Sequence, residues 1–324
     1  MIDVNKEIER LDWKREPYGL YEPIEYTLAG GGKRVRPTLA LLASDMFGGK
    51  AEDVLSAALA LEVFHNFTLL HDDVMDHSDT RRGRQTVWVR WDENTAILSG
   101  DQMMIEAYRL LAGDERVGYK GVPADKLCKV LRDFNRMATE ICEGQQYDVD
   151  FETRDDVTIE EYMEMIRLKT SVLLANALQT GAYIAGATEA QQQALYDFGI
   201  HVGLAFQIQD DILDVYGDPA TFGKPIGGDI LNNKKTYMLL TALAKATGED
   251  KTELERWLTA EAPVPAEKIV AVTALYTRLG VREVCEQIML EHTHEALALL
   301  STLPQGPAAE ALRALAEKLL KRNK

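Results

Sequence analysis

Hydrophobic side chains recur along this 324-residue chain at intervals of three and four residues, the repeat of an α-helix with one buried face. Clear examples are residues 54–63, 168–178 and 308–320. Residues 158–161 read Thr-Ile-Glu-Glu, a capping-box pattern typical of a helix start. Strict alternation of β-branched residues is missing, so the pattern predicts an all-α fold.

No linker rich in proline, glycine or serine interrupts the helical pattern, so we expect residues 1–324 to form a single domain, one large helical bundle. Hydrophobic residues make up 46% of the chain, enough for a large core, yet we find no apolar run of the length that a membrane span needs. Residues 1–7 carry acids and lack the hydrophobic segment of a signal peptide. We therefore expect a cytoplasmic protein.

Two copies of an acidic pattern, at residues 72–76 and 210–214, are embedded in this helical sequence. Residues four apart share a helix face, so the first and last acids of each copy point the same way and repel by a few tenths of a kcal/mol. Bound cations offset that repulsion. Magnesium combines one or two protein carboxylates with water and phosphate oxygens, so the pattern indicates several Mg²⁺ ions and a polyphosphate ligand. The alternative is two exposed acidic faces in a chain with 52 acids. The acids concerned are Asp72, Asp73, Asp76, Asp210, Asp211 and Asp214.

Basic segments lie close to the first acidic pattern. Residues 81–84 read Arg-Arg-Gly-Arg, and guanidinium groups match phosphate oxygens two at a time. Residues 30–37 place three glycines before three cations, a combination that suits an anion but also suits a glycine linker opening a helix. His65 lies two helical turns before Asp72, on nearly the same face.

Taken together, these residues resemble the trans-type isoprenyl diphosphate synthases, the head-to-tail polyprenyl synthetases. The matching segments are GGGKRVRP at 30–37, FHNFTLLHDDVMDHSDTRRGRQT at 64–86, RLKTS at 167–171 and FQIQDDILDVYGDPATFGKPIGGDILNNKKTY at 206–237. One departure is Gln85, where the family usually has proline. The resemblance implies the isoprenoid synthase fold, with two aspartate-rich helices facing a central cavity, and a homodimer.

The reaction that the resemblance implies joins isopentenyl diphosphate to an allylic diphosphate and releases diphosphate. Its hard step breaks the allylic C–O bond, so catalysis should lie in fixed cations around the leaving group. By this analogy Asp72 and Asp76 hold two Mg²⁺ ions and Asp210 a third, with Mn²⁺ as a substitute. Asp73, Asp211 and Asp214 are then further ligands or residues that orient the ligands.

The resemblance also divides the cations between the two substrates. The residues implied for the allylic diphosphate are Arg81, Lys169, Lys224 and Lys234. Those implied for isopentenyl diphosphate are Lys33, Arg36, His65 and Arg82. Thr170 and Gln207 are implied to direct oxygen atoms at the developing carbocation, although a core threonine bonded back to its own helix is an equal reading of Thr170.

Two other functions share part of this pattern. A class I terpene cyclase ionises one diphosphate, but its second metal motif mixes Asn, Ser or Thr with Glu, whereas here it is a full aspartate triplet. A non-catalytic subunit of a heteromeric prenyl synthase typically loses acids from one or both patterns, and both are whole here. The pattern therefore favours the synthase.

Product length depends on what lies just before Asp72. Phe67 is an aromatic where long-chain relatives resemble one another in having a small residue, and Thr68 is small where many farnesyl-making relatives carry an aromatic. One blocking ring predicts products of C15 to C20, with the C20 geranylgeranyl diphosphate favoured. An ideal helix places Phe67 about 140° from Asp72, so the ring could instead belong to the core.

Charge and the remaining reactive side chains limit the other functions. A formal net charge of −16 argues against binding to nucleic acid or anionic lipid. Cys128, Cys142 and Cys285 lack metal-binding spacing, and we expect buried thiols. His292 and His294 are two residues apart, a spacing that suits a zinc site poorly because it places the rings on different helix faces.

Overall fold

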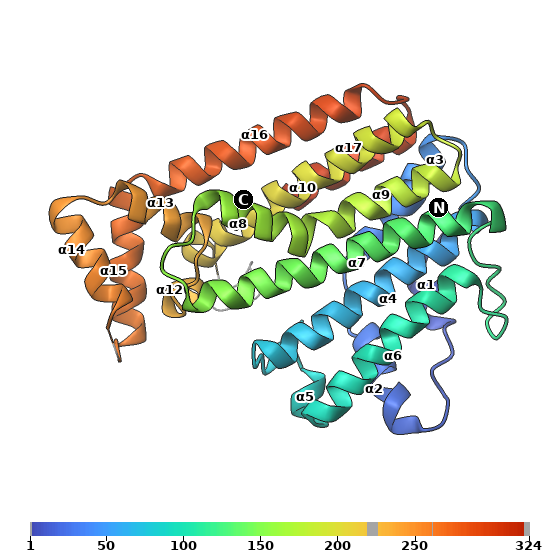
Figure 1. Ribbon diagram of the computed structural model, residues 1–324, viewed down its shortest axis with the longest axis horizontal. Coiled ribbons are helices and arrows are strands. Elements are labelled where there is room, and N and C mark those ends of the chain that lie inside the picture. The colour runs from blue at the N-terminus through green and yellow to red at the C-terminus, as the bar shows by residue number, and fades with distance from the viewer. Residues whose placement is uncertain (1, 219–225, 261, 321–324) are drawn as a thin grey trace. The chain divides into compact units, whose positions relative to one another are not determined.

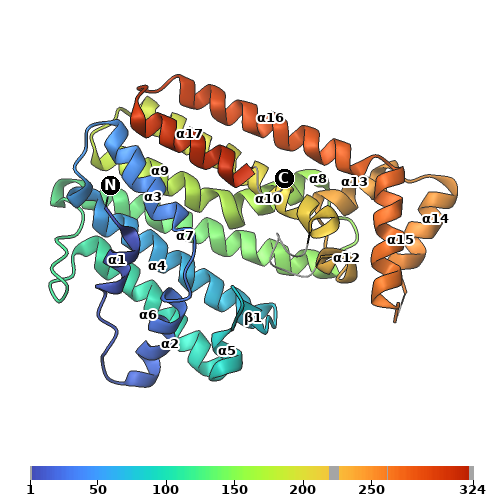
Figure 2. The same cartoon turned by 180° about the vertical axis from the view of Figure 1, so that it is seen from behind.

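The computed structural model describes residues 2–218, 226–260 and 262–320, and almost all of its regular structure is helical (Figures 1 and 2). The prediction of an all-α fold is confirmed. Within the described residues the sheet is limited to a hairpin in which β1 (Thr80–Arg81) pairs antiparallel with β2 (Arg84–Gln85). Thr80 is paired with Gln85 and Arg81 with Arg84.

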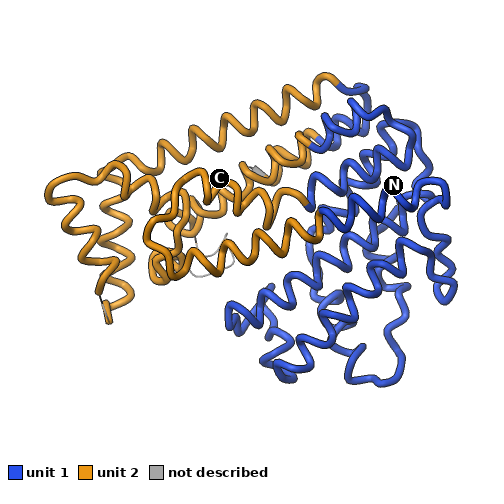
Figure 3. Tube along the Cα trace, in the orientation of Figure 1, with its two compact units in different colours: residues 1–136, 173–196, 303–312 blue, residues 137–172, 197–302, 313–324 orange. Residues whose placement is uncertain are grey.

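Two compact units divide the chain (Figure 3). Unit 1 comprises residues 1–136, 173–196 and 303–312, and unit 2 comprises 137–172, 197–302 and 313–324. Because each unit is built from separate segments, this division does not correspond to two successive domains, and the expected single domain stays a prediction. The helices that contribute residues to both units are α7 (Ala124–Thr153), α9 (Val172–Ile184), α10 (Glu189–Tyr216) and α17 (Pro307–Leu320).

Unit 1 is built around helix α4. The elements that lie wholly within this unit are α1 (Val4–Glu9), α2 (Tyr18–Leu28), α3 (Val35–Met46), α4 (Ala51–Met75), the hairpin, α5 (Val87–Arg90) and α6 (Glu93–Ala112). Helices α3 and α6 pack against α4, and α6 runs beside it in both views (Figures 1 and 2). Gly181 of α9 allows a close approach to α3, because a Cβ atom there would lie 2.1 Å from the carbonyl oxygen of Ala40.

Helix α4 is apolar on nearly every face, as expected for a central helix. Its length and hydropathy meet the criterion for a membrane span, so the expectation that no segment reaches that length is wrong. In the structure, however, 72% of the apolar window is buried inside the protein. Neighbouring helices therefore cover the surface that a lipid would otherwise contact.

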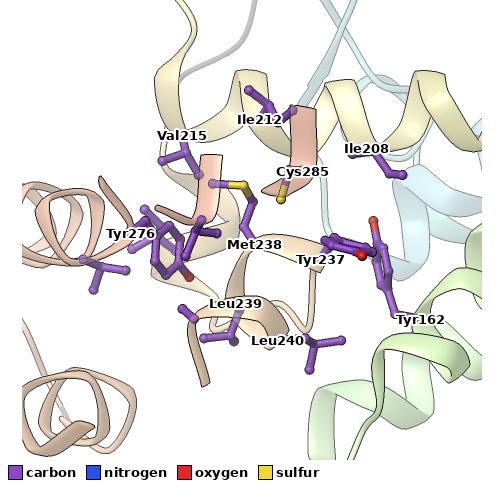
Figure 4. Close-up of a cluster of buried hydrophobic side chains, with 14 of the residues drawn as sticks. Tyr162, Ile208, Ile212, Val215, Tyr237, Met238, Leu239, Leu240, Tyr276 and Cys285 are labelled. Atoms are coloured by element: carbon purple, nitrogen blue, oxygen red, sulfur yellow. The ribbon is translucent and has the colours of Figure 1, made fainter. Parts of the chain in front are cut away.

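Unit 2 has its own hydrophobic core around α13, whose residues Tyr237 and Met238 are buried (Figure 4). The elements that lie wholly within this unit are α8 (Ile159–Ile166), the π-helix η1 (Arg167–Ser171), α12 (Gly228–Leu231), α13 (Tyr237–Lys245), α14 (Gly248–Leu258), α15 (Pro265–Arg278) and α16 (Val281–Ser301). The predicted capping box at Thr158 and Glu161 is present at the start of α8. The backbone N–H of Thr158 donates to the Glu161 carboxylate, and the backbone N–H of Glu161 donates to the Thr158 hydroxyl oxygen. These two bonds fix where the helix begins.

The expectation of three buried thiols is wrong for two of them. Cys285 is buried in the core of unit 2, where burial raises the pKa of its thiol to about 12. Cys128 and Cys142 are exposed. Both lie on α7, whose polar face places them outside a core.

Candidate active site

The first acidic motif lies at the C-terminal end of α4. Asp72 and Asp73 belong to its last turn, and Asp76 caps it through a bond from its backbone N–H to the Asp72 carbonyl oxygen at 2.8 Å. A helix C-terminus carries partial negative charge, so carboxylates there are destabilised more than elsewhere on a helix. This position raises the need for nearby cations.

Arg81 supplies one such cation. It lies on β1, and its Nε and Nη2 atoms each donate to the carboxylate of Asp73 at 2.7 Å. Asp73 is only 5% exposed, and burial raises the pKa of its carboxyl to about 6 against the opposing effect of Arg81. This pairing holds the β hairpin beside the end of α4. It suits the role of Asp73 as a residue that orients its neighbours.

The second acidic motif lies near the C-terminal end of α10, so both motifs share the same electrostatic setting. The carboxylate of Asp214 accepts a bond from the backbone N–H of Asp229 at 3.0 Å, and its carbonyl oxygen accepts one from Gly227 at 2.6 Å. These bonds attach the segment before α12 to the end of α10. Asp229 thereby becomes a further acid of this site that sequence reasoning missed.

The middle acid of this motif is also the buried one. Asp211 is 4% exposed and accepts a bond from the hydroxyl of Tyr162 at 2.5 Å and one from the backbone N–H of Tyr237 at 3.3 Å. Burial, followed by the nearby charge of Asp229, raises the pKa of Asp211 well above its usual range. These contacts favour an orienting role for Asp211.

Of the three cations after the glycine run, Arg34 does not face an anion site. Its guanidinium is buried and donates to the Glu62 carboxylate at 2.7 Å, to the Leu28 carbonyl oxygen at 2.6 Å and to Asn5 at 3.1 Å. Arg34 adopts a left-handed backbone conformation with φ at 46° immediately before α3. The interpretation that all three cations compensate an anion is therefore wrong for this residue.

Arg36, His65 and Arg82 do come together in unit 1. Burial and the charges of Arg36 and Arg82 lower the pKa of His65 well below its usual value, which places the three groups in one electrostatic environment. Burial also lowers the pKa of Arg36 to about 10, against the charge of Glu62. Arg82 bonds the carbonyl oxygen of Gly31, which links the β hairpin to the glycine segment. A pocket next to this cluster is lined by Asp73, Arg81 and Arg82 among others.

Lys33, the fourth residue predicted for isopentenyl diphosphate, is exposed in the same glycine segment. Three of the four predicted side chains are thus shown to lie in one region of unit 1, and the fourth follows the glycines that Arg82 contacts.

Lys169 and Thr170 lie in the π-helix η1, a feature that the helical pattern did not predict. A π-helical turn widens the helix and is frequent at functional sites. Two glycines make room for it. A Cβ atom at Gly144 would lie 2.4 Å from the Lys169 nitrogen, and one at Gly203 would lie 2.6 Å from the Ser171 Cα atom.

Thr170 donates its hydroxyl hydrogen to Gln207 Oε1 at 3.3 Å, so these two predicted residues meet. This contact joins two helices, η1 and α10, and is not a bond back to the helix of Thr170. The two residues predicted to face the carbocation thus lie within hydrogen-bond distance of each other, and their role there stays a prediction.

Asp148 of α7 is another residue that sequence reasoning missed. Its carboxylate lies 2.5 Å from Lys169 Nζ and 3.7 Å from Lys234 Nζ, so it joins two of the lysines predicted for the allylic diphosphate. Although burial acts to raise it, the two lysines hold the pKa of Asp148 below its usual value. The position within GQQYD at 144–148 carries no helical or charge pattern that would single it out. Lys224, predicted for the same substrate, lies outside the described residues.

Phe67 lies on α4, where it is half-buried, and its ring contacts the rings of Phe64 and His71 at centroid distances of 5.3 and 4.8 Å. Thr68 donates its hydroxyl hydrogen to the His65 carbonyl oxygen at 2.8 Å, which leaves it as a small, helix-bonded side chain. His292, whose metal ligation the spacing argued against, forms a hydrogen bond with His201 between their Nδ1 atoms at 2.9 Å.

Carboxylate oxygens are the ligands that Mg²⁺ prefers, and both acidic motifs offer them. Among the described residues, no three His, Cys, Asp or Glu side chains gather closely enough to enclose a metal ion by themselves. Carboxylate oxygens make up the donor set of both motifs, and they fit Mg²⁺, which completes its shell with water and substrate oxygens.

Residues 17–275 match the family model of polyprenyl synthetase. This chain belongs to the polyprenyl synthetase family. The synthetase is 39% identical over 307 residues to a short chain isoprenyl diphosphate synthase of Methanothermobacter thermautotrophicus, covering 94% of this chain and 91% of that protein. It is 37% identical over 325 residues to a geranylfarnesyl diphosphate synthase of Natronomonas pharaonis, covering 95% and 92%.

A crystal structure of a geranylgeranyl pyrophosphate synthase superimposes on this polyprenyl synthetase with a TM-score of 0.91 and 44% sequence identity over the whole of both chains. The all-α isoprenoid synthase fold predicted from the sequence is therefore confirmed. Relatives with different product names have similar identities, so overall similarity does not decide product length.

Proposed function

We propose that this polyprenyl synthetase is a trans-prenyltransferase that condenses isopentenyl diphosphate with an allylic diphosphate, either dimethylallyl, geranyl or farnesyl. The observation that carries the proposal is the combination of two complete aspartate motifs at helix C-termini with cations that fall into separate groups. A reaction between two anionic substrates needs a separate set of cations for each, whereas ionising a single diphosphate does not.

The acidic motifs are proposed to bind three Mg²⁺ ions, with Mn²⁺ as a substitute. Asp72 and Asp76 would hold two ions and Asp210 the third, and Asp214 would assist. When bound, these ions neutralise the negative charge that collects on the leaving diphosphate. The buried Asp73 and Asp211 would keep the other carboxylates in place through Arg81 and Tyr162, which is the supporting role that their contacts favour.

Lys169 and Lys234 are proposed to bind the allylic diphosphate, together with Arg81 and Lys224. The shared contact with Asp148 supports this role because it keeps two flexible ammonium groups near one position before a substrate arrives. Holding cations in place in advance lowers the reorganisation that charge development in the transition state would require.

Lys33, Arg36, His65 and Arg82 are proposed to bind isopentenyl diphosphate without a metal ion. Because its pKa is depressed, His65 is neutral at pH 7 and offers one N–H donor without adding charge. Arg36 and Arg82 stay charged and can each donate two bonds to phosphate oxygens. Binding the diphosphate would replace the contact between Arg82 and the Gly31 carbonyl oxygen.

Thr170 and Gln207 are proposed to direct their oxygen atoms at the carbocation formed when the allylic C–O bond breaks. Their mutual hydrogen bond supports this, because it fixes the direction of the Gln207 side chain. The new bond forms between the carbocation and the double bond of isopentenyl diphosphate. The released diphosphate is then the base that removes the final proton.

The product is proposed to be C15 to C20, with geranylgeranyl diphosphate favoured. The growing chain would extend along α4 until it meets the ring of Phe67, while the small Thr68 leaves the pocket deeper than one that accepts only C15. The half-buried state of Phe67 supports this, because a ring wholly enclosed by the core would have no open side for a product to reach.

We also propose a cytoplasmic homodimer that uses α6. Leu98 and Ile105 lie two turns apart on this helix and are 59% and 51% exposed, and Ile97 beside them is 38% exposed. Large apolar side chains grouped on one helix face are typical of surfaces that a partner covers. A second copy of the chain fits the family resemblance.

The proposal is tested by incubating the purified chain alone with Mg²⁺, radiolabelled isopentenyl diphosphate and each allylic primer in turn. We expect labelled diphosphates that end mainly at C20. Consumption of an allylic diphosphate without incorporation of label would indicate cyclisation. Absence of any product, in a folded protein, would indicate a non-catalytic subunit.

A further inference from the structure

The ring of Phe67 is the outer member of a row of aromatic side chains in unit 1. Phe67 contacts Phe64 edge to face, Phe64 contacts Phe134 at a centroid distance of 5.1 Å, and Phe134 contacts Tyr108 at 5.2 Å. Phe64 and Phe134 are each 1% exposed, whereas Phe67 is half-buried. The row therefore supports one side of the Phe67 ring. The orientation of that ring also depends on a second neighbouring side chain.

That neighbour is His71, one helical turn further along α4. Its ring meets the Phe67 ring edge to face, with an interplanar angle of 69°. The Nε2 atom lies 3.0 Å from the carbonyl oxygen of Ile97 in α6. A carbonyl oxygen only accepts hydrogen bonds, so Nε2 carries the hydrogen. His71 is thus tied to a second helix while its ring touches Phe67.

Gly100 makes this contact with α6 possible. A Cβ atom at residue 100 would lie 2.3 Å from His71 Nε2 and 2.4 Å from Cδ2, closer than any real contact. Even alanine at residue 100 would displace the imidazole from the Ile97 carbonyl oxygen. The sequence thus provides three matched features: an imidazole, a backbone acceptor and a gap opposite them.

We propose that His71 is a positioning residue for product length: tied to α6, it holds the Phe67 ring in the orientation that ends the product pocket. This inference rests on the proposed function, in which Phe67 stops chain growth. His71 immediately precedes the first metal-binding aspartate, but its imidazole is directed to α6. Without the His71 imidazole, the Phe67 ring has Phe64 as its one aromatic neighbour on α4, and it can adopt further rotamers that open the pocket.

The decisive experiment compares the products of the wild type, Phe67→Ala, His71→Ala and the double variant. We expect His71→Ala to raise the ratio of C25 to C20 by about two- to tenfold, the effect of losing one aromatic pair. Phe67→Ala should raise it at least as far. If His71 acts through Phe67, adding His71→Ala to Phe67→Ala changes nothing further, because residues that act as a unit are not additive.

Gly100→Ala is a second route to the same result that leaves the imidazole in the protein. Alanine also favours the helical conformation of α6, so this variant should remain folded. We expect it to lengthen the products as His71→Ala does. His77→Ala is the matched control, because His77 lies in the turn after α4 and contacts Trp88 instead of Phe67. Its products should match the wild type.

Three results would overturn the proposal, and each would remove a different part of the argument. Unchanged products in Phe67→Ala would remove the pocket assignment in the proposed function as well. Longer products from Phe67→Ala but unchanged products from folded His71→Ala and Gly100→Ala would overturn the role of His71 alone. Additive lengthening in the double variant would show that His71 lines the pocket itself.

Discussion

At the scale of the residue, the middle aspartate of each acidic motif differs from its neighbours. Asp73 and Asp211 are 5% and 4% exposed, and each is held by a side chain from another element, Arg81 and Tyr162 respectively. Buried carboxylates need such partners, since an unpaired one costs several kcal/mol. The metal ligands proposed above are instead drawn from the first and last acids of each motif.

Replacing Asp72 or Asp210 by asparagine should lower kcat/KM by about 10²-fold or more, because each removes charge that would fix a metal ion at the leaving group. The change keeps the shape of the side chain, so circular dichroism should show an intact helical fold. Asp79→Asn, at an exposed acid just beyond the first motif, is the control. Full activity of either variant, or of the wild type in excess EDTA, would contradict the proposed metal chemistry.

Removing a cation proposed for isopentenyl diphosphate and removing one proposed for the allylic diphosphate should change the KM values of different substrates. Arg82→Ala should raise the KM for isopentenyl diphosphate, and Lys169→Ala should raise that for the allylic substrate, each by about tenfold or more for the loss of a charged hydrogen bond. Steady-state kinetics with one substrate varied at a time measures the split. Lys50→Ala, before α4, should change neither constant. Equal effects on both substrates would instead indicate one shared anion site.

At the scale of the element, the π-helix η1 depends on glycines in two other helices. Gly144 of α7 and Gly203 of α10 each allow the backbone of η1 to approach more closely than a Cβ atom would permit. A π-helical turn is less stable than an α-helical one, so surrounding contacts must maintain it. Lys169 and Thr170 owe their positions to this arrangement.

Gly203→Ala should therefore impair catalysis even though alanine is the better helix former. Its Cβ atom would lie 2.6 Å from the Ser171 Cα atom, which forces η1 to move and separates Thr170 from Gln207. We expect kcat to fall by about tenfold or more, in line with small displacements at an active site. Gly19→Ala in α2, where a Cβ atom meets nothing within 4 Å, should retain full activity.

Helices α10 and α16 are joined by the bond between His201 and His292, which gives unit 2 a pH-dependent contact. Burial is the main cause that lowers both pKa values from 6.5, and the charge of His201 adds to the effect on His292. The nearby Asp197, Glu291 and Glu295 oppose the shift. A folded-state pKa below the unfolded value means that stability is complete above pH 6.5 and declines as the pH falls below it.

His292→Gln should reduce this acid-dependent loss of stability, because one of the two titrating groups is removed. Urea unfolding between pH 5 and pH 8 measures the effect as the change in unfolding free energy with pH. His294→Gln, at the exposed neighbour, should leave that dependence as in the wild type. A slope that is the same in all three proteins would mean that the pair does not contribute to it.

At the scale of the whole molecule, the exposed apolar face of α6 predicts association. Leu98→Glu together with Ile105→Glu should convert a homodimer to a monomer, since charged side chains would be buried without partners at the interface. Light scattering coupled to gel filtration measures the mass. Val270→Glu, at a residue of α15 that is 70% exposed, is the matched control and should leave the mass unchanged.

Much of this protein can be read from its sequence. Helical periodicity, the capping box at Thr158 and both aspartate motifs are local patterns, because each depends on residues within a turn or two of one another. The cations beside the motifs and the order of the matching segments then identify the family.

Only the tertiary structure decided what each polar group does. It directed Arg34 inward to Glu62 while Arg36 joined His65, and it widened residues 167–171 into a π-helix. It also brought Asp148 to Lys169 and His71 to α6. These outcomes depend on burial, on charges from other elements and on the space beside distant glycines, and no local pattern in the sequence encodes which residues will meet.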